Sequence, residues 1–176
     1  LKDVPVSAWA PYWTLPEATA SLNAHGDSME QVSPSWYSAT AAGAIDQVGS
    51  DTAAWAQPLI DAAHAHHVAI LPSISDGMPA NGMAAVLADP AMRTQHVQAI
   101  VSLVQAAGFD GIDIDYETFA YKDSRTTWDT TRPNWVAFIS ELGTALHANG
   151  KLLTVSVPPI YDSDRTADSG YWVYDY

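Results

Sequence analysis

The segment Phe109–Glu117 carries the residues of this chain that are best placed to do chemistry. Asp113, Asp115 and Glu117 alternate with apolar or aromatic residues, and a period of two is typical of a β-strand. The three carboxyl groups are therefore expected on one face of that strand. Three like charges on one strand face are unfavourable unless the face catalyses a reaction or binds a cation.

Carboxyl groups two residues apart on a strand lie roughly 6 to 7 Å apart along the chain. Groups that close repel each other, so one of them tends to keep its proton near neutral pH. A raised pKa on the last acid, Glu117, would let it protonate a leaving oxygen, while Asp115 stays ionised and stabilises developing positive charge. A protonated acid beside an ionised one is suited to the cleavage of a glycosidic bond.

Two other interpretations of the acids stay open at this point. The acids could form the solvated face of a strand in an antiparallel sheet, or they could bind calcium. The segment lacks the glycine and ligand spacing of an EF-hand loop, so calcium binding is disfavoured.

His64, His66 and His67 have spacing that suggests a metal, but solvated histidines at the end of a helix explain them better. No metal site is predicted.

The acidic segment resembles the DxxDxDxE signature of family 18 glycoside hydrolases, the chitinase-like (β/α)8 barrels, at all four acidic positions. The resemblance implies that Glu117 is the proton donor, that Asp115 orients the acetamide of the substrate, and that Asp113 shares charge deeper in the barrel. In that family the acetamide oxygen attacks the anomeric carbon, giving retention through an oxazolinium intermediate. Asp110 is out of phase with the other acids, so we interpret Asp110 and Gly111 as structural residues of the motif.

A second segment, Leu71–Gly77, partly resembles the SxGG segment of the same family. Ser73 occupies the serine position, while Ser75 and Asp76 replace the two glycines. We expect Ser73 to donate a hydrogen bond to Asp113 on the neighbouring strand, and Asp76 to contact substrate from the carboxyl end of its strand. An ordinary strand end with an Asp-Gly turn explains the segment equally well.

Aromatic residues are candidates for sugar stacking, because the chain has seven Trp and eight Tyr residues. Tyr12 and Trp13 end the first strand, and Trp36 and Tyr37 lie on the second. Neighbouring residues of a strand point in opposite directions, so one of each pair at most lines a barrel interior. We predict Tyr12, Trp36 and, within the acidic motif, Tyr116 as substrate-binding residues.

The composition of the chain restricts its function further. It has 176 residues, a formal net charge of −13, 48% hydrophobic residues and no cysteine. One globular unit is expected, nucleic acid and anionic membranes are unlikely partners, and thiol chemistry is excluded. No signal peptide is present at Leu1–Pro5, no cofactor-binding motif occurs, and no apolar run reaches the ~20 residues of a membrane span. No cofactor is predicted.

Strand-like and helix-like segments alternate along the chain, which predicts an α/β fold with parallel strands and right-handed crossovers. Predicted helices include one that Asp89 caps, with Pro90 at its first position and Gly108 at its end. The predicted strands are Val6–Trp13, Val32–Ser38, Val68–Ser75, Phe109–Glu117 and Leu152–Pro158.

The length of the repeating units bears on the size of the fold. Three βα units take 120 residues between Val32 and Leu152, so an eight-stranded barrel at this rate needs roughly 320 residues. We therefore expect residues 1–176 to form one partial catalytic domain that supplies about the first five βα units of a (β/α)8 TIM barrel.

The resemblance implies a glycosidase that cleaves β-1,4 links in polysaccharide containing N-acetylglucosamine, in chitin or peptidoglycan. A secreted or cell-wall location is expected for such a substrate. The segment Pro34–Ser38 and the compact loops resemble bacterial members of the family that are related to spore and cell-wall hydrolases. The alternatives are a catalytically silent carbohydrate-binding protein, of lectin or inhibitor type, and an inactive fragment. An open five-stranded sheet is expected to self-associate, or to pair with the rest of the barrel.

Overall fold

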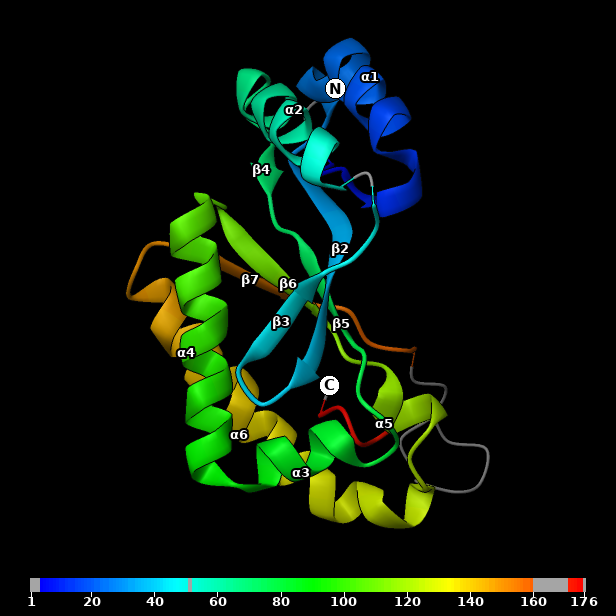
Figure 1. Cartoon of the computed structure of the whole chain (residues 1–176), viewed down its shortest axis with the longest axis vertical. Coiled ribbons are helices and arrows are strands. Elements are labelled where there is room, and N and C mark those ends of the chain that lie inside the picture. Colours follow the sequence, from blue (N-terminus) through cyan, green and yellow to red (C-terminus); the bar gives the residue numbers. More distant parts are fainter. Residues whose placement is uncertain (1–3, 51, 160–170, 176) are drawn as a thin grey trace.

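The structure is a computed structural model, and it describes residues 4–50, 52–159 and 171–175. It is an α/β fold with a mainly parallel sheet, as the alternation of segments predicts (Figure 1). Five strands follow one another in the order β1-β2-β5-β6-β7, and every neighbouring pair on this path is parallel. Within the described ranges, β1 and β7 are the two ends of this path.

The five predicted strands are confirmed, with shorter bounds at several ends. The predicted third strand is divided at Leu71 and Pro72 into two short strands, both of which pair with β2. A short antiparallel strand that the sequence analysis did not predict folds back on β2. The strands are β1 Ser7–Pro11, β2 Gln31–Ala41, β3 Ala44–Gln47, β4 Ala69–Ile70, β5 Ser73–Asp76, β6 Gly111–Asp115 and β7 Leu152–Val155.

The helices connect these strands in the way that parallel pairing requires. Asp89 caps α4 as predicted, because its Oδ1 accepts hydrogen bonds from the amides of Ala91 and Met92 at 2.8 and 3.2 Å. Gly108 ends α4 with φ 71°. The α-helices are α1 Leu15–His25, α2 Thr52–Ala65, α3 Gly82–Ala88, α4 Pro90–Ala107, α5 Thr118–Tyr121 and α6 Trp128–His147, and the 3₁₀ turns are η1 Tyr12–Thr14, η2 Gly26–Ser28 and η3 Arg125–Thr127.

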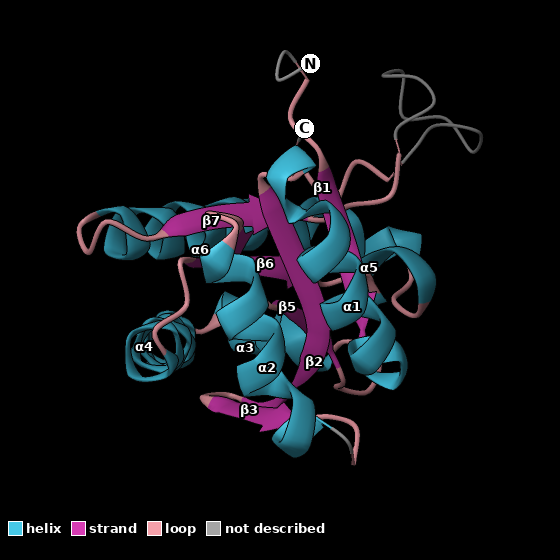
Figure 2. Cartoon of the chain, turned by 90° about the horizontal axis from the view of Figure 1, so that it is seen from above, coloured by secondary structure: helices cyan, strands magenta, loops and turns pink. Residues whose placement is uncertain are grey.

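The helices pack in two groups along the sheet. Helices α1 and α2 lie side by side near β1, β2 and β4, whereas α3, α4 and α6 pack together near β6 and β7 (Figures 1 and 2). Ile74, Ile112 and Ile114 are fully buried in the core between the strands and the helices. None of the helices in the described ranges is long and apolar enough to span a bilayer.

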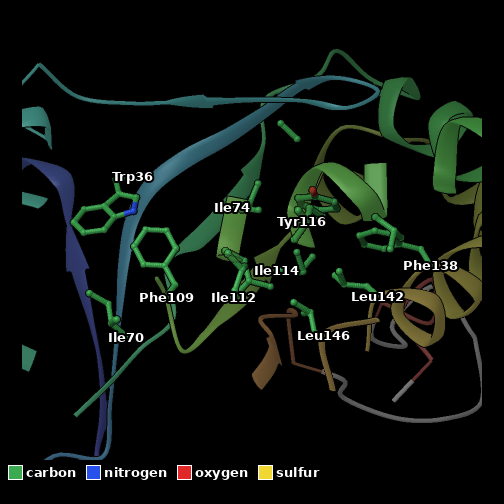
Figure 3. Packing of buried hydrophobic residues seen from close by; sticks show 14 of the residues in the cluster. Trp36, Ile70, Ile74, Phe109, Ile112, Ile114, Tyr116, Phe138, Leu142 and Leu146 are labelled. Carbon is green, nitrogen blue, oxygen red and sulfur yellow. The ribbon is translucent and has the colours of Figure 1, made fainter. Parts of the chain in front are cut away.

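Trp36 lies in this core, so its prediction as a sugar-binding residue is wrong. Its side chain is 0% exposed, and its ring centroid lies 6.2 Å from that of Phe109 (Figure 3). The ring of Tyr37 also lies 6.2 Å from Phe109. The pairing of β2 with β5 shifts between Ser35 and Tyr37, and this irregularity breaks the strict alternation that the prediction assumed.

Tyr116 is also buried, and its prediction as a substrate-binding residue is wrong as well. Its ring is 0% exposed and stacks on Phe138 of α6, with centroids 5.9 Å apart and planes 8° from parallel (Figure 3). Its hydroxyl group lies 2.7 Å from Nε2 of the buried His96 on α4. An aromatic residue between two acidic residues of the motif is therefore part of the core here.

Candidate active site

Asp113 is held by three hydroxyl groups from the two neighbouring strands. Ser73 on β5 donates a hydrogen bond to Oδ2 at 2.6 Å, as predicted. Thr154 on β7 donates to Oδ1 at 2.8 Å, and Ser156 lies 3.2 Å from both oxygens. The carboxyl group is 2% exposed, so these contacts satisfy a buried charge.

Thr154 and Ser156 were not predicted, although the sequence contained a signal for them. Both are two residues apart on the fifth predicted strand, and in a parallel sheet they face the same side as Asp113. The register confirms this, since Asp113 pairs with Thr154.

Asp115 and Glu117 line one small cleft, of about 220 Å³, at the carboxyl ends of β5 and β6. The strand stops at Asp115, and Glu117 has the helical φ and ψ of −93° and −4° at the start of α5. The expectation that all three acids share one strand face is therefore wrong for Glu117. The cleft is lined by Ser75, Asp76, Asp115, Glu117, Thr118, Tyr121 and Lys122.

The three acids affect one another, although the protonation pattern differs from the prediction. Burial, and then the negative charges of Glu117 and Asp113, raise the pKa of Asp115 from 3.8 to about 6. The expectation that Asp115 stays ionised therefore holds only above about pH 6. Within the described ranges, no group of three or more His, Cys, Asp or Glu residues is arranged to hold a metal ion.

Asp76 lines the same cleft, and its contact with substrate stays a prediction. Its Oδ1 accepts a hydrogen bond from the amide of Met78 at 2.9 Å. Its Oδ2 is buried without a hydrogen-bonding partner among the described residues. Burial raises the pKa of this carboxyl group above its ordinary value, and the amide of Met78 opposes that effect.

Asp110 and Gly111 occupy structural positions at the opposite end of β6. The Oδ2 of Asp110 accepts a hydrogen bond from the amide of Ile70 at 2.9 Å and lies 3.1 Å from Nε2 of His64. A side chain at position 111 would collide with the carbonyl group of Leu152 on β7. The first acid of the motif thus joins strands β4 and β6, and the glycine permits β7 to pair closely.

Tyr12 and Trp9 show how the aromatic residues of the first strand are distributed. Tyr12 lies in η1, packs edge-on against Trp13 with centroids 4.8 Å apart, and does not line the cleft of Asp115. Its substrate contact stays a prediction.

Trp9, which was not predicted, is 63% exposed and borders a second hollow with Ser33 and Asp113. Two further hollows, near His66 and Asp110, lie at the amino ends of the strands, away from these acids.

The parallel sheet places three acids near its carboxyl ends: the buried Asp113, Asp115 with its raised pKa, and the exposed Glu117. Enzymes built as (β/α) barrels carry their active sites at this end of the sheet. The comparison with known families agrees with this class. The family described as glycosyl hydrolases family 18 matches residues 38–176, and the chain belongs to this family.

Similar proteins support the same assignment. A chitinase from Chromobacterium violaceum is 25% identical with a TM-score of 0.74, and the comparison covers 96% of this chain and 50% of that one. A class V chitinase from Pseudomonas fluorescens is also 25% identical, with a TM-score of 0.75 over 98% of this chain and 50% of that one. The Bacillus subtilis protein YdhD, named as a sporulation-specific glycosylase, is 33% identical over 93 residues, which are 52% of this chain and 19% of YdhD. The chain thus spans about half the length of these solved structures.

Proposed function

We propose that this chain carries the acid–base centre of a glycosidase that cleaves β-1,4 links in polysaccharide containing N-acetylglucosamine. The observation that carries the proposal is the shared cleft of Asp115 and Glu117, with Asp113 fixed behind it by Ser73 and Thr154. The names of the similar chitinases suggest chitin as the substrate, and peptidoglycan is the alternative that the proposal keeps. Because both polymers lie outside the cytoplasm, a secreted or cell-wall location accompanies the proposal.

In the proposed reaction Glu117 donates its proton to the glycosidic oxygen as the bond to the anomeric carbon breaks. Asp115, ionised above about pH 6, accepts a hydrogen bond from the acetamide N–H of the substrate. This contact turns the acetamide oxygen toward the anomeric carbon, where it attacks and closes an oxazolinium ring. Glu117 then takes a proton from water, which opens the ring with net retention.

Product analysis of N-acetylglucosamine oligomers tests this proposal. The Glu117→Gln variant removes the proton but keeps the shape of the side chain, so we expect loss of turnover with retained oligomer binding. Glu17→Gln, an exposed glutamate on α1, is the matched control and should cleave as the unchanged chain does. Equal cleavage by Glu117→Gln would contradict the proposal.

The same experiment separates the proposal from a carbohydrate-binding role without catalysis. A lectin of this fold would bind the oligomers and release no products, with or without Glu117. The presence of Glu117 in the cleft favours the enzyme, because a protein that only binds sugar has no need of a proton donor there.

A further inference from the structure

Tyr121 is an exposed aromatic residue beside the proposed proton donor. Its side chain is 59% exposed, and it lines the same cleft as Asp115 and Glu117. An exposed ring in a cleft presents an apolar face that water solvates poorly. The position of Tyr121 therefore indicates contact with a ligand that has an apolar face of its own.

The backbone fixes Tyr121 at one helical turn from Glu117. The amide of Tyr121 donates a hydrogen bond to the carbonyl oxygen of Glu117 at 3.1 Å. One α-helical turn rises about 5.4 Å, a distance comparable with the length of one sugar ring. Tyr121 thus lies within reach of a sugar that directly adjoins the bond at Glu117.

The ring of Tyr121 packs against a group of buried and half-buried aromatic residues. Its ring contacts that of Tyr171 edge-on, with centroids 5.6 Å apart, and Tyr171 packs 5.7 Å from Trp128. Trp128 is 1% exposed, and its indole N–H donates a hydrogen bond to the carbonyl oxygen of Phe119 at 2.6 Å. This contact ties α5 to α6, so the ring of Tyr121 rests on fixed neighbours.

Arg125 also packs against these aromatic rings. Its guanidinium group lies 4.9 Å from the ring centroid of Trp128 and 5.0 Å from that of Trp172. Cation–π contacts of this length hold aromatic rings in place. A preorganised ring loses little conformational freedom when a ligand stacks on it.

We propose that Tyr121 is the stacking platform for the sugar on the leaving-group side of the cleaved bond. This inference rests on the proposed function, in which Asp115 holds the sugar that is attacked and Glu117 protonates the oxygen between the two sugars. Asp115 ends β6 and Tyr121 ends the helical turn that follows Glu117, and Tyr121 is therefore assigned to the sugar beyond that oxygen. The C–H face of a pyranose is the apolar surface that packs on such a ring.

Transfer from an activated donor tests the platform directly. The oxazoline of N,N′-diacetylchitobiose serves as a donor that has no leaving sugar. An added N-acetylglucosamine oligomer that binds on the leaving-group side can attack this donor in place of water. In Tyr121→Ala we expect the ratio of transfer to hydrolysis to fall roughly three- to tenfold, the range of one lost aromatic stack. Tyr121→Phe keeps the ring and should keep the ratio. An unchanged ratio in Tyr121→Ala would overturn the platform.

A binding measurement keeps the inference testable if the oxazoline is not consumed. Absence of turnover by the unchanged chain would count against the proposed function, not against the platform. Calorimetric titration of chitotetraose then compares the unchanged chain, Tyr121→Ala and Tyr121→Phe. Weaker binding by Tyr121→Ala alone supports the platform, and equal affinity of all three proteins overturns it.

Discussion

The carboxyl group of Asp115 shares its surroundings with two other acids, and this has a cost in stability. Its pKa is raised to about 6 in the folded protein, against an ordinary value of 3.8. The folded protein therefore keeps a proton at pH values where the unfolded chain has lost it. The resulting stability is fully present below pH 3.8 and is lost as the pH rises through about 6.

His96 has the opposite effect over an overlapping range of pH. Burial lowers its pKa from 6.5 to about 4, because the core disfavours the charged imidazole. Its contribution to stability is present above pH 6.5 and is lost as the pH falls through about 4. The two residues therefore partly cancel each other in the pH dependence of unfolding.

We predict that Asp115→Asn stabilises the fold at pH 7 but not at pH 4. The substitution removes a partly buried charge that also repels Glu117 and Asp113, and it does so only where Asp115 is ionised. We expect a gain of about 1 kcal/mol at pH 7, reduced from the full effect of the pKa shift because solvent screens a partly exposed group. Denaturant unfolding of both proteins between pH 4 and 7 measures the difference. A difference that does not change with pH would contradict the raised pKa.

The predictions for single residues were correct where the strand is regular and wrong where it is not. Alternation placed Asp113 beside Ser73 correctly, because β5 and β6 pair in regular register at that point. It failed for Trp36, where the pairing of β2 shifts, and for Glu117, which lies beyond the end of β6. Tyr121 gave no signal, because a helix of one turn has no hydrophobic period to detect.

Tyr116 is the residue after strand β6 and lies between Asp115 and Glu117 in the sequence. Its hydrogen bonds connect the end of the strand to two other parts of the chain. Its hydroxyl group lies 2.7 Å from Nε2 of His96 on α4, and its carbonyl oxygen accepts a hydrogen bond from the hydroxyl of Tyr174 at 2.6 Å. Because burial lowers the pKa of His96 to about 4, its ring is neutral near pH 7 and shares one hydrogen bond with the Tyr116 hydroxyl. Elements α4, β6 and the segment at Tyr174 are thereby joined next to the two acids.

We predict that Tyr116→Phe lowers the free energy of unfolding by about 1–3 kcal/mol, the cost of a buried polar group without a partner. The substitution keeps the stacked ring but leaves Nε2 of His96 without its hydrogen bond. Nδ1 of His96 already has no hydrogen-bonding partner among the described residues. Urea unfolding at pH 7 measures the change.

Tyr121→Phe is the control for this measurement, because the same hydroxyl group is removed from a side chain that is 59% exposed. It should unfold within about 0.5 kcal/mol of the unchanged chain. Equal stability of Tyr116→Phe and Tyr121→Phe would show that the hydrogen bond between Tyr116 and His96 contributes nothing to the free energy of unfolding.

At the level of elements, local signals decided which segments could be predicted. Helix α4 carries its cap Asp89, Pro90 and the final Gly108 in the sequence, and all three act as predicted. Strand β3 lacks such signals, whereas helix α1 has Pro16 in its first turn and Gly26 at its C-terminal end but was not predicted. The hairpin of β2 and β3 depends on the turn at Gly43, with φ 75°, and on pairing that only the folded sheet supplies.

In the part of the chain that the structure describes, both end strands of the sheet carry an exposed apolar side chain. Trp9 on β1 is 63% exposed and Leu152 on β7 is 50% exposed, and these two strands are the ends of the sheet path in the described residues. The similar chitinase structures are about twice as long as this chain. In a closed barrel the inner face and both edges are covered.

We predict that the chain, studied by itself, associates through this sheet. Unpaired strand edges and exposed apolar side chains favour contact with a second copy. Multi-angle light scattering should give a mass above 18.9 kDa that rises with concentration. Combining Trp9→Ser with Leu152→Lys removes two of the exposed apolar groups and should lower that mass toward the monomer.

Met92→Ser is the matched control for the association experiment, because Met92 is 38% exposed but lies on the outer helix α4. It should associate as strongly as the unchanged chain, since the edges β1 and β7 are intact. A chain that stays monomeric at every concentration would contradict the prediction. Equal loss of association in Met92→Ser would show that general surface hydrophobicity, and not the open sheet, drives the contact.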